Sequence, residues 1–138
     1  MIVLDTNVLS ETLRPKPSPR VLEWLRSHPA TALFTTTITE AEIHFGLELL
    51  PAGRRRHALQ EAIARIFDTD MSGRVLPFDR AAAREYALLA AARRKMGIPI
   101  AQADAQIAAI IRSRGAALAT RNISDFASCG FDVIDPWK

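Results

Sequence analysis

Short apolar segments alternate with helical segments along the whole chain, and this alternation constrains the fold more than any other feature. The expected strands are Ile2–Leu4, Ala32–Thr36, Val75–Phe78, Ala117–Thr120 and Phe131–Ile134. The expected helices are Val8–Leu13, Val21–Ser27, Ile38–Leu50, Arg55–Phe67, Ala81–Met96 and Ala101–Arg114. Apolar strands separated by helices are typical of an α/β protein with a mostly parallel sheet that is covered on both faces.

The composition is that of one ordered domain. The 138 residues are 49% hydrophobic and 24% charged, and a chain of this length is within the usual range for a single domain. We therefore expect residues 1–138 to fold as one domain. The formal net charge of +3 permits an anionic partner but does not require one.

Several kinds of functional site are excluded. Cys129 is the only cysteine, so the chain forms neither an internal disulfide nor a cysteine-based zinc site. His28, His44 and His57 lack the spacing of zinc ligands and are expected at the surface or at helix ends. The 6 glycines form no phosphate-binding loop, which excludes nucleotide hydrolysis of that type.

The sequence shows no signal for export or membrane insertion. Leu4 is followed directly by Asp5, with no basic leader and no long apolar segment. The longest apolar stretch, Tyr86–Ala92, is far shorter than the roughly 18 to 20 residues that a membrane helix needs. We expect a cytoplasmic protein.

Asp5 follows the first expected strand directly. In parallel sheets, ligands bind beyond the carboxyl ends of the strands, so Asp5 is a candidate site residue. Aspartate is also a good N-cap, and a helix follows shortly afterwards. The sequence leaves both roles open.

A second candidate acid lies on the helix that follows the second strand. At about 100° per residue, Glu42 falls on the apolar stripe that includes Phe45 and Leu49. Glu40 falls on another side and is expected to face solvent. Thr39 and Glu42 also have the spacing of a capping box, which is the alternative explanation for Glu42.

Asp104 lies on an apolar helix face with Ile107 and Ile111, where an unpaired carboxylate would be costly. Asn122 and Asp125 follow the fourth strand, and either could instead cap a turn. If the oxygen-bearing side chains converge, they suit Mg²⁺ or Mn²⁺. A cation held in this way can activate water for hydrolysis of a phosphodiester.

These segments, taken together and in order, resemble the PIN-domain endoribonucleases. More specifically, they resemble the VapC toxins of bacterial toxin–antitoxin modules, including the FitB-like branch. The similarity spans essentially the whole chain. The segments that carry it are Ile2–Glu11, Ile38–Glu42 with Gly46, Val75–Asp79, Ala103–Ala109, and Ala119–Asn122 with Asp125–Phe126.

The resemblance implies a three-layer α/β/α sandwich around a central, mostly parallel five-stranded sheet. It also implies that Asp5, Glu42 and Asp104 are catalytic and bind Mg²⁺, with Mn²⁺ as a substitute. Asp5 and Asp104 would be the principal ligands. Many members of the family have an aspartate where this chain has Asn122, and Asp125 could supply the missing acid. The number of metal ions is therefore left open.

The resemblance extends to substrate and partners. Thr6, Asn7 and Thr120 would shape the substrate pocket, and the substrate would be RNA. A homodimer is implied, as is a cognate antitoxin of the VapB or FitA type whose C-terminal segment covers the acidic pocket. Arg121 directly follows the fourth strand and is the first choice for a phosphate contact.

Other positively charged residues available for contact with RNA include Arg54–Arg56 and Arg93–Lys95. The three arginines Arg54–Arg56 open a helix, where cations oppose the helix dipole, so they either contact an anion or form a solvated turn. Leu13, Trp24 and Leu25 are expected in the core, with a docking groove for an antitoxin helix as the alternative.

Two other functions stay open. A phosphatase of the haloacid-dehalogenase type also has an aspartate after its first strand, but its second acid would fall on Asn7. A non-catalytic RNA-binding or interaction module would keep the fold without the chemistry.

Overall fold

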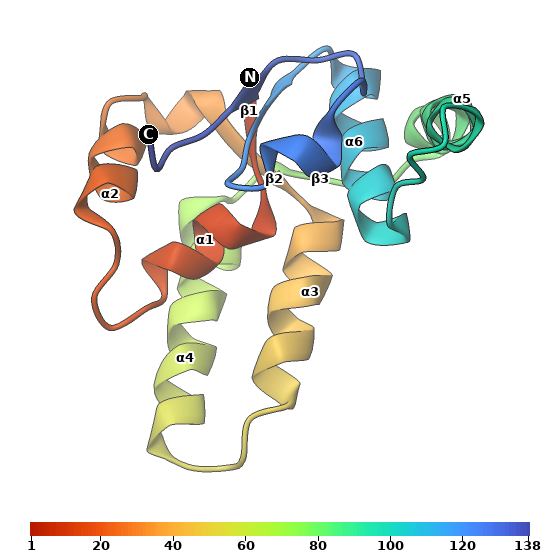
Figure 1. Ribbon diagram of the computed structural model, residues 1–138. Helices are drawn as coiled ribbons and strands as arrows, with labels where there is room; N and C mark the ends of the chain where they lie inside the picture. Colours follow the sequence, from red (N-terminus) through yellow and green to blue (C-terminus); the bar gives the residue numbers. More distant parts are fainter.

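The computed structural model describes all 138 residues, and at its centre is a sheet of five parallel strands (Figure 1). The strands lie in the order β3-β2-β1-β4-β5, and every neighbouring pair is parallel. Their bounds are β1 Ile2–Leu4, β2 Leu33–Thr36, β3 Val75–Leu76, β4 Ala117–Ala119 and β5 Val133–Ile134. The expectation of a mostly parallel five-stranded sheet is confirmed.

Six α-helices connect and cover the strands. They are α1 Thr6–Thr12, α2 Pro19–Arg26, α3 Thr37–Glu48, α4 Arg54–Arg65, α5 Arg80–Lys95 and α6 Gln102–Arg114. Three short helical turns complete the chain: η1 Ala30–Ala32, a π-helical turn η2 Ile66–Asp70, and a 3-10 turn η3 Ile123–Phe126.

The core is divided between the two faces of the sheet. Val3 and Leu118 pack in a cluster with α5 and α6, whereas Leu4 and Ala119 pack in a second cluster with α1, α2, α3 and α4. Consecutive side chains of a strand point to opposite faces, so one short apolar strand supplies both clusters. The molecule therefore has the expected three layers (Figure 1).

The element bounds differ from the expected ones where local chemistry decides them. The helix α1 begins at Thr6 instead of Val8, because the side chain of Asp5 caps it. The strand β3 ends at Leu76, before Pro77, which lacks the backbone N–H that a longer ladder would need. Gly115, with φ of 62°, ends α6 in the left-handed conformation.

Leu13, Trp24 and Leu25 are partly buried and pack against the second cluster, as expected, and so does Trp137. Cys129 is a free thiol buried in the first cluster. None of the helices combines the length and the apolar character needed to cross a membrane.

Candidate functional site

Asp5 links the end of β1 to the start of α1. Its Oδ1 atom accepts a 2.8 Å hydrogen bond from the backbone N–H of Thr6, and its Oδ2 atom accepts a 2.7 Å bond from the hydroxyl of Thr120. The residue is only 5% exposed, and burial raises the pKa of its carboxyl group against the opposing effect of these bonds. Asp5 is thus both the N-cap of α1 and a carboxylate at the sheet edge.

Thr120 and Asn7 hold the sheet edge together. Thr120 is fully buried, and its Oγ1 atom accepts from the side-chain amide of Asn7 at 3.1 Å and from the backbone N–H of Asn122 at 3.1 Å. The Oδ1 atom of Asn7 accepts from the backbone N–H of Arg121 at 3.3 Å. Asn7 therefore fastens α1 to the segment that follows β4.

Glu42 reaches the site from α3, on an apolar stripe that does not face the core. The buried face of α3 carries Ile43 and Leu47, whereas Phe45 and Leu49 are 66% and 69% exposed. The apolar stripe that includes Glu42 thus faces outward, and Glu42 itself is exposed. A sequence period shows that a helix has an apolar stripe, but not whether that stripe faces the core.

The capping-box explanation for Glu42 is wrong. The N-cap of α3 is Thr36, whose hydroxyl accepts from the backbone N–H of Thr39 at 3.1 Å. Glu42 instead accepts a 2.8 Å hydrogen bond at Oε1 from the hydroxyl of Thr6, which lies 3.1 Å from the hydroxyl of Thr39. The carboxylate of Glu42 is thereby turned towards the sheet edge. Glu40 pairs with His44 at 3.9 Å, on another side of the helix.

Asp104 lies in the first turn of α6 and is half-buried. The face below it is apolar as expected, since Ile107 and Ile111 are fully buried. The carboxylate makes no hydrogen bond or ion pair. Burial raises the pKa of Asp104 to about 6, and the negative charges of Asp5, Asp125 and Glu42 add to the shift. The four acids therefore lie close enough to repel one another.

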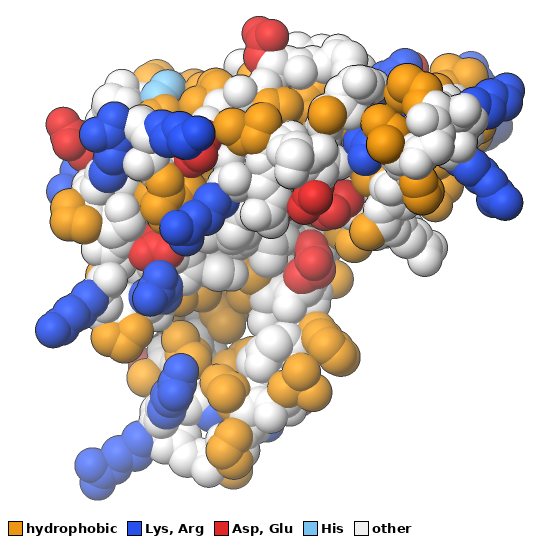
Figure 2. All heavy atoms as spheres, in the orientation of Figure 1, with side chains coloured by type: hydrophobic (Ala, Val, Ile, Leu, Met, Phe, Trp, Pro, Cys, Tyr) orange, Lys and Arg blue, Asp and Glu red, His pale blue; other side chains and the backbone are white.

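One polar cavity of about 360 Å³ brings these residues together. No hydrophobic residue lines it; its walls are Asp5, Thr6, Asn7, Ser10, Glu42, Asp104 and Asn122. Sequence reasoning missed Ser10, although its position one helical turn beyond Thr6 and Asn7 places all three on one face of α1. Figure 2 shows acidic side chains gathered where α1, α3 and α6 meet.

The remaining candidates lie at the margin of this cavity. Asp125 is exposed on η3 and raises the pKa of both Asp5 and Asp104 through its charge. The guanidinium of Arg121 lies 5.0 Å over the ring of Trp137, and its charge contributes to the lowered pKa of Glu11. Arg121 thus sits on the α1 side of the site.

The residues present fit a divalent cation of the magnesium type. No three acidic, histidine or cysteine side chains are close enough to form a complete ligand cage. Mg²⁺ keeps several waters and is usually held by only one or two carboxylates, so a complete cage is not needed. All donors around the cavity are oxygen-bearing, and a cation would offset the burial and repulsion that raise the pKa of Asp104.

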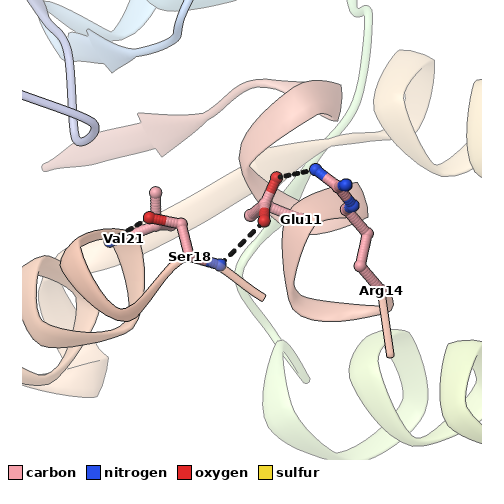
Figure 3. A network of polar contacts seen from close by, with 4 residues as sticks. All are labelled: Glu11, Arg14, Ser18 and Val21. Carbon is pink, nitrogen blue, oxygen red and sulfur yellow. Dashed lines mark hydrogen bonds and ion pairs between the residues drawn. The ribbon is translucent and has the colours of Figure 1, made fainter. Parts of the chain in front are cut away.

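Glu11 fixes the segment beside the site (Figure 3). Its side chain is 6% exposed, and its Oε2 atom accepts from the backbone N–H of Ser18 at 2.8 Å. Its Oε1 atom pairs with Arg14 at 3.2 Å. The bond from Ser18 and the charge of Arg14 lower the pKa of Glu11. Arg14 consequently stays at the edge of a second cavity.

This second cavity, of about 380 Å³, lies between α1, α3 and α4 and adjoins the polar one. The two share Thr6, Ser10 and Glu42. Its floor is apolar, and Arg14 and Arg55 lie among its lining residues. Arg56, by contrast, donates to the carbonyl of Leu50 at 3.0 Å and pairs with Glu48 at 2.9 Å, so the expected contact with an anion is confirmed for one of the three arginines at the start of α4.

Comparison with known proteins identifies relatives over the full chain. The family model described as PIN domain matches residues 2–131. The chain is 43% identical to the VapC ribonuclease Y4jK of Sinorhizobium fredii, covering 100% of this chain and 99% of the relative. It is 38% identical to Toxin FitB of Neisseria gonorrhoeae, over 99% of each protein. The crystal structure of FitAcB from Neisseria gonorrhoeae superposes with a TM-score of 0.93, covering 99% of each chain at 38% identity.

Proposed function

This chain belongs to the PIN-domain family, and from that premise we propose that it is the toxin of a type II toxin–antitoxin system, a metal-dependent endoribonuclease. The observation that carries the proposal is the convergence of Asp5, Glu42 and Asp104 on one polar cavity. They come from the end of β1, from α3 and from the start of α6. The relatives named as a ribonuclease and as a toxin support the same function.

Asp5 and Asp104 would be the principal ligands of Mg²⁺ or Mn²⁺, with Glu42, Asn122 and Asp125 completing the site directly or through water. The bound cation would supply an activated water and would stabilise negative charge on a phosphoryl oxygen. Asp104 is suited to this role because its carboxylate has no competing hydrogen bond. Asp5 accepts one bond at each oxygen, from Thr6 and from Thr120, which fixes its orientation and leaves a second lone pair on each oxygen for the cation.

The chain's own polar groups would orient the RNA. Thr6 and Ser10 line the cavity with hydroxyl groups, and Asn7 keeps α1 fastened to the end of β4. Arg121 is exposed beside the acidic residues, where a guanidinium can contact a phosphate. Lysine and arginine side chains lie on the α1 and α2 side of the acidic cluster in Figure 2. Their positive charge would attract the negatively charged RNA towards the cavity from that side.

We infer two protein partners. An antitoxin of the VapB or FitA type would cover the acidic cavity, where basic antitoxin side chains would match the charge. A second copy of the chain would cover the exposed apolar residues of α3 and α5. Phe45 on α3 and Leu88 on α5, with Leu49 and Met96 at the C-terminal ends of these helices, are each more than half exposed. With these partners and an RNA substrate, we propose a cytoplasmic location.

The experiment that tests the proposal is RNA cleavage by the purified chain with Mg²⁺ or Mn²⁺, with and without EDTA. We expect metal-dependent cleavage that falls by at least about a hundredfold in Asp5→Asn and Asp104→Asn. Glu40→Gln is the matched control, since Glu40 lies on α3 but pairs with His44 outside the cavity.

The same experiment separates the alternatives. A non-catalytic RNA-binding module would bind RNA equally in the wild type and in Asp5→Asn, and would not cleave it. A phosphatase would instead form a phosphorylated Asp5. The engagement of Asn7 with Thr120 disfavours the phosphatase, because the second acid of such a site is replaced by an amide that fastens the fold.

A further inference from the structure

Arg93 is a buried cation without an acidic partner. It lies on α5, is only 5% exposed, and forms no ion pair with any carboxylate. Arginine is almost never fully buried unless it is paired. The sequence placed Arg93 among the residues available to RNA, and its burial excludes that role. Its position therefore needs another explanation.

Backbone carbonyls take the place of the missing acid. The Nε atom of Arg93 donates to the carbonyl of Ile98 at 2.7 Å. Its Nη1 atom donates to the carbonyls of Asp125 and Ala127 at 3.0 and 2.9 Å, and it lies 3.6 Å from Sγ of Cys129. One guanidinium thus links the connection between α5 and α6 to the segment around Asp125 and Ala127, and these two segments belong to no common helix or strand.

Both of these segments adjoin residues of the acidic site. Ile98 lies in the connection that leads into α6, whose first turn holds Asp104. The carbonyl of Asp125 belongs to η3, which follows Asn122 directly. The guanidinium fork is planar and rigid, so its donors fix the spacing between the segments that they contact.

We propose that Arg93 is a positioning residue of the acidic site: its buried guanidinium holds the Asp125 segment against the connection that leads from α5 into α6. It thereby sets how tightly the site binds a divalent cation. This inference rests on the proposed function, because it requires that the acidic cavity binds a metal. Groups that orient metal ligands typically contribute about 10-fold to 100-fold in metal affinity.

The test is the affinity of the full-length chain for Mn²⁺, measured by isothermal titration calorimetry and by the Mn²⁺ spin-resonance signal. We expect Arg93→Met, which removes the charge and the donors, to weaken binding at least about tenfold. Arg93→Lys keeps the charge but cannot reach both segments with one rigid fork, so we expect a smaller loss. Arg94→Met, which changes the exposed neighbour on α5, should bind Mn²⁺ as the wild type does.

Coupling to Asp125 separates positioning from general stability. If Arg93 acts through the Asp125 segment, Asp125→Asn should weaken Mn²⁺ binding in the wild type and have a smaller effect in the Arg93→Lys background. Equal effects in both backgrounds would overturn the inference. So would a folded Arg93→Met or Arg93→Lys chain with unchanged Mn²⁺ affinity. If Arg93→Met does not fold, Arg93→Lys decides the matter alone.

Failure of the proposed function gives a different result. A wild-type chain that binds no Mn²⁺, or one whose affinity is unchanged by Asp5→Asn and Asp104→Asn, overturns both proposals. A chain that loses Mn²⁺ in those two variants but keeps it in the Arg93 variants overturns only the role of Arg93.

Discussion

Thr120 donates a 2.7 Å hydrogen bond to Asp5 across 115 residues of sequence, and this bond joins the carboxyl ends of β4 and β1. The same hydroxyl accepts from Asn7 and from the backbone of Asn122. The buried side chain of Thr120 therefore connects Asp5, a principal candidate metal ligand, to α1 through Asn7 and to the segment after β4 through Asn122.

Thr120→Val removes the hydroxyl and its hydrogen bonds but keeps the shape of the side chain, so it tests the hydrogen bonds separately from the packing. The change leaves the donors of Asn7 and Asn122 without their acceptor, and a lost buried partner costs about 1 to 3 kcal/mol in the free energy of unfolding. It also removes a bond that lowers the pKa of Asp5, so that pKa should rise further and Mn²⁺ affinity should fall. Thermal melting and titration calorimetry measure the two effects.

Thr35→Val is the matched control for Thr120→Val. Thr35 is equally buried in the sheet, its hydroxyl donates to the carbonyl of Leu4 at 3.0 Å, and neither residue lines the cavity. The Thr35→Val variant should have a lower free energy of unfolding than the wild type and the same affinity for Mn²⁺. Equal metal affinities in the two variants would show that Thr120 has no special role at the site.

Asp104 should make the metal-free fold less stable as the pH rises. Its pKa is about 6 in the folded state against 3.8 as a reference, so the folded chain holds this proton more tightly than the unfolded chain. The resulting stabilisation is present below about pH 4 and is lost as the pH rises through about 6. Because the group is half-buried, screening reduces the effect to on the order of 1 kcal/mol.

Asp104→Asn should remove this pH dependence. Without metal, the variant should be more stable than the wild type at about pH 7, and the difference should shrink towards about pH 4. Urea unfolding at the two pH values, in the presence of EDTA, measures it. A constant difference between wild type and variant across this range would show that Asp104 is not under electrostatic strain.

Asn122→Asp should strengthen metal binding at the expense of the metal-free fold. A fourth carboxylate on the cavity wall would add to the repulsion on Asp104 and lower stability in EDTA. The same charge should tighten Mn²⁺ binding by about tenfold, which calorimetry measures. Ser124→Asp adds an equal charge on η3 away from the cavity wall and should have a much smaller effect. Equal gains in both variants would indicate a general charge effect.

Phe45→Glu should dissociate the proposed homodimer. Phe45 is 66% exposed on α3, so the substitution should leave the fold intact while placing a charge in an apolar contact. Sedimentation velocity should show a monomer for Phe45→Glu and a dimer for the wild type. Ala58→Glu, at an exposed position of α4, should remain dimeric. A Phe45→Glu chain that also stays dimeric would move the interface away from α3.

The sequence was sufficient where the signal is local. Three apolar residues before Asp5 define a buried strand and place an acid at its end, and an acid above Ile107 and Ile111 marks α6. The expected order of strands and helices is confirmed, because turn residues and apolar periods are properties of neighbouring residues. The bounds shifted by a few residues where caps and Pro77 acted.

The tertiary structure decided everything that depends on what packs against a helix. Two apolar stripes of α3 have the same helical period: one carries Phe45 and Leu49, and the other carries Ile43. Only the packing of α1 and α4 against the Ile43 stripe makes that stripe part of the core. In the sequence, Arg93 is indistinguishable from any basic residue near a helix end. In the structure it is buried and donates to carbonyls 32 and 34 residues away. A residue's own sequence neighbourhood determines its period, whereas its burial depends on distant segments that the period does not specify.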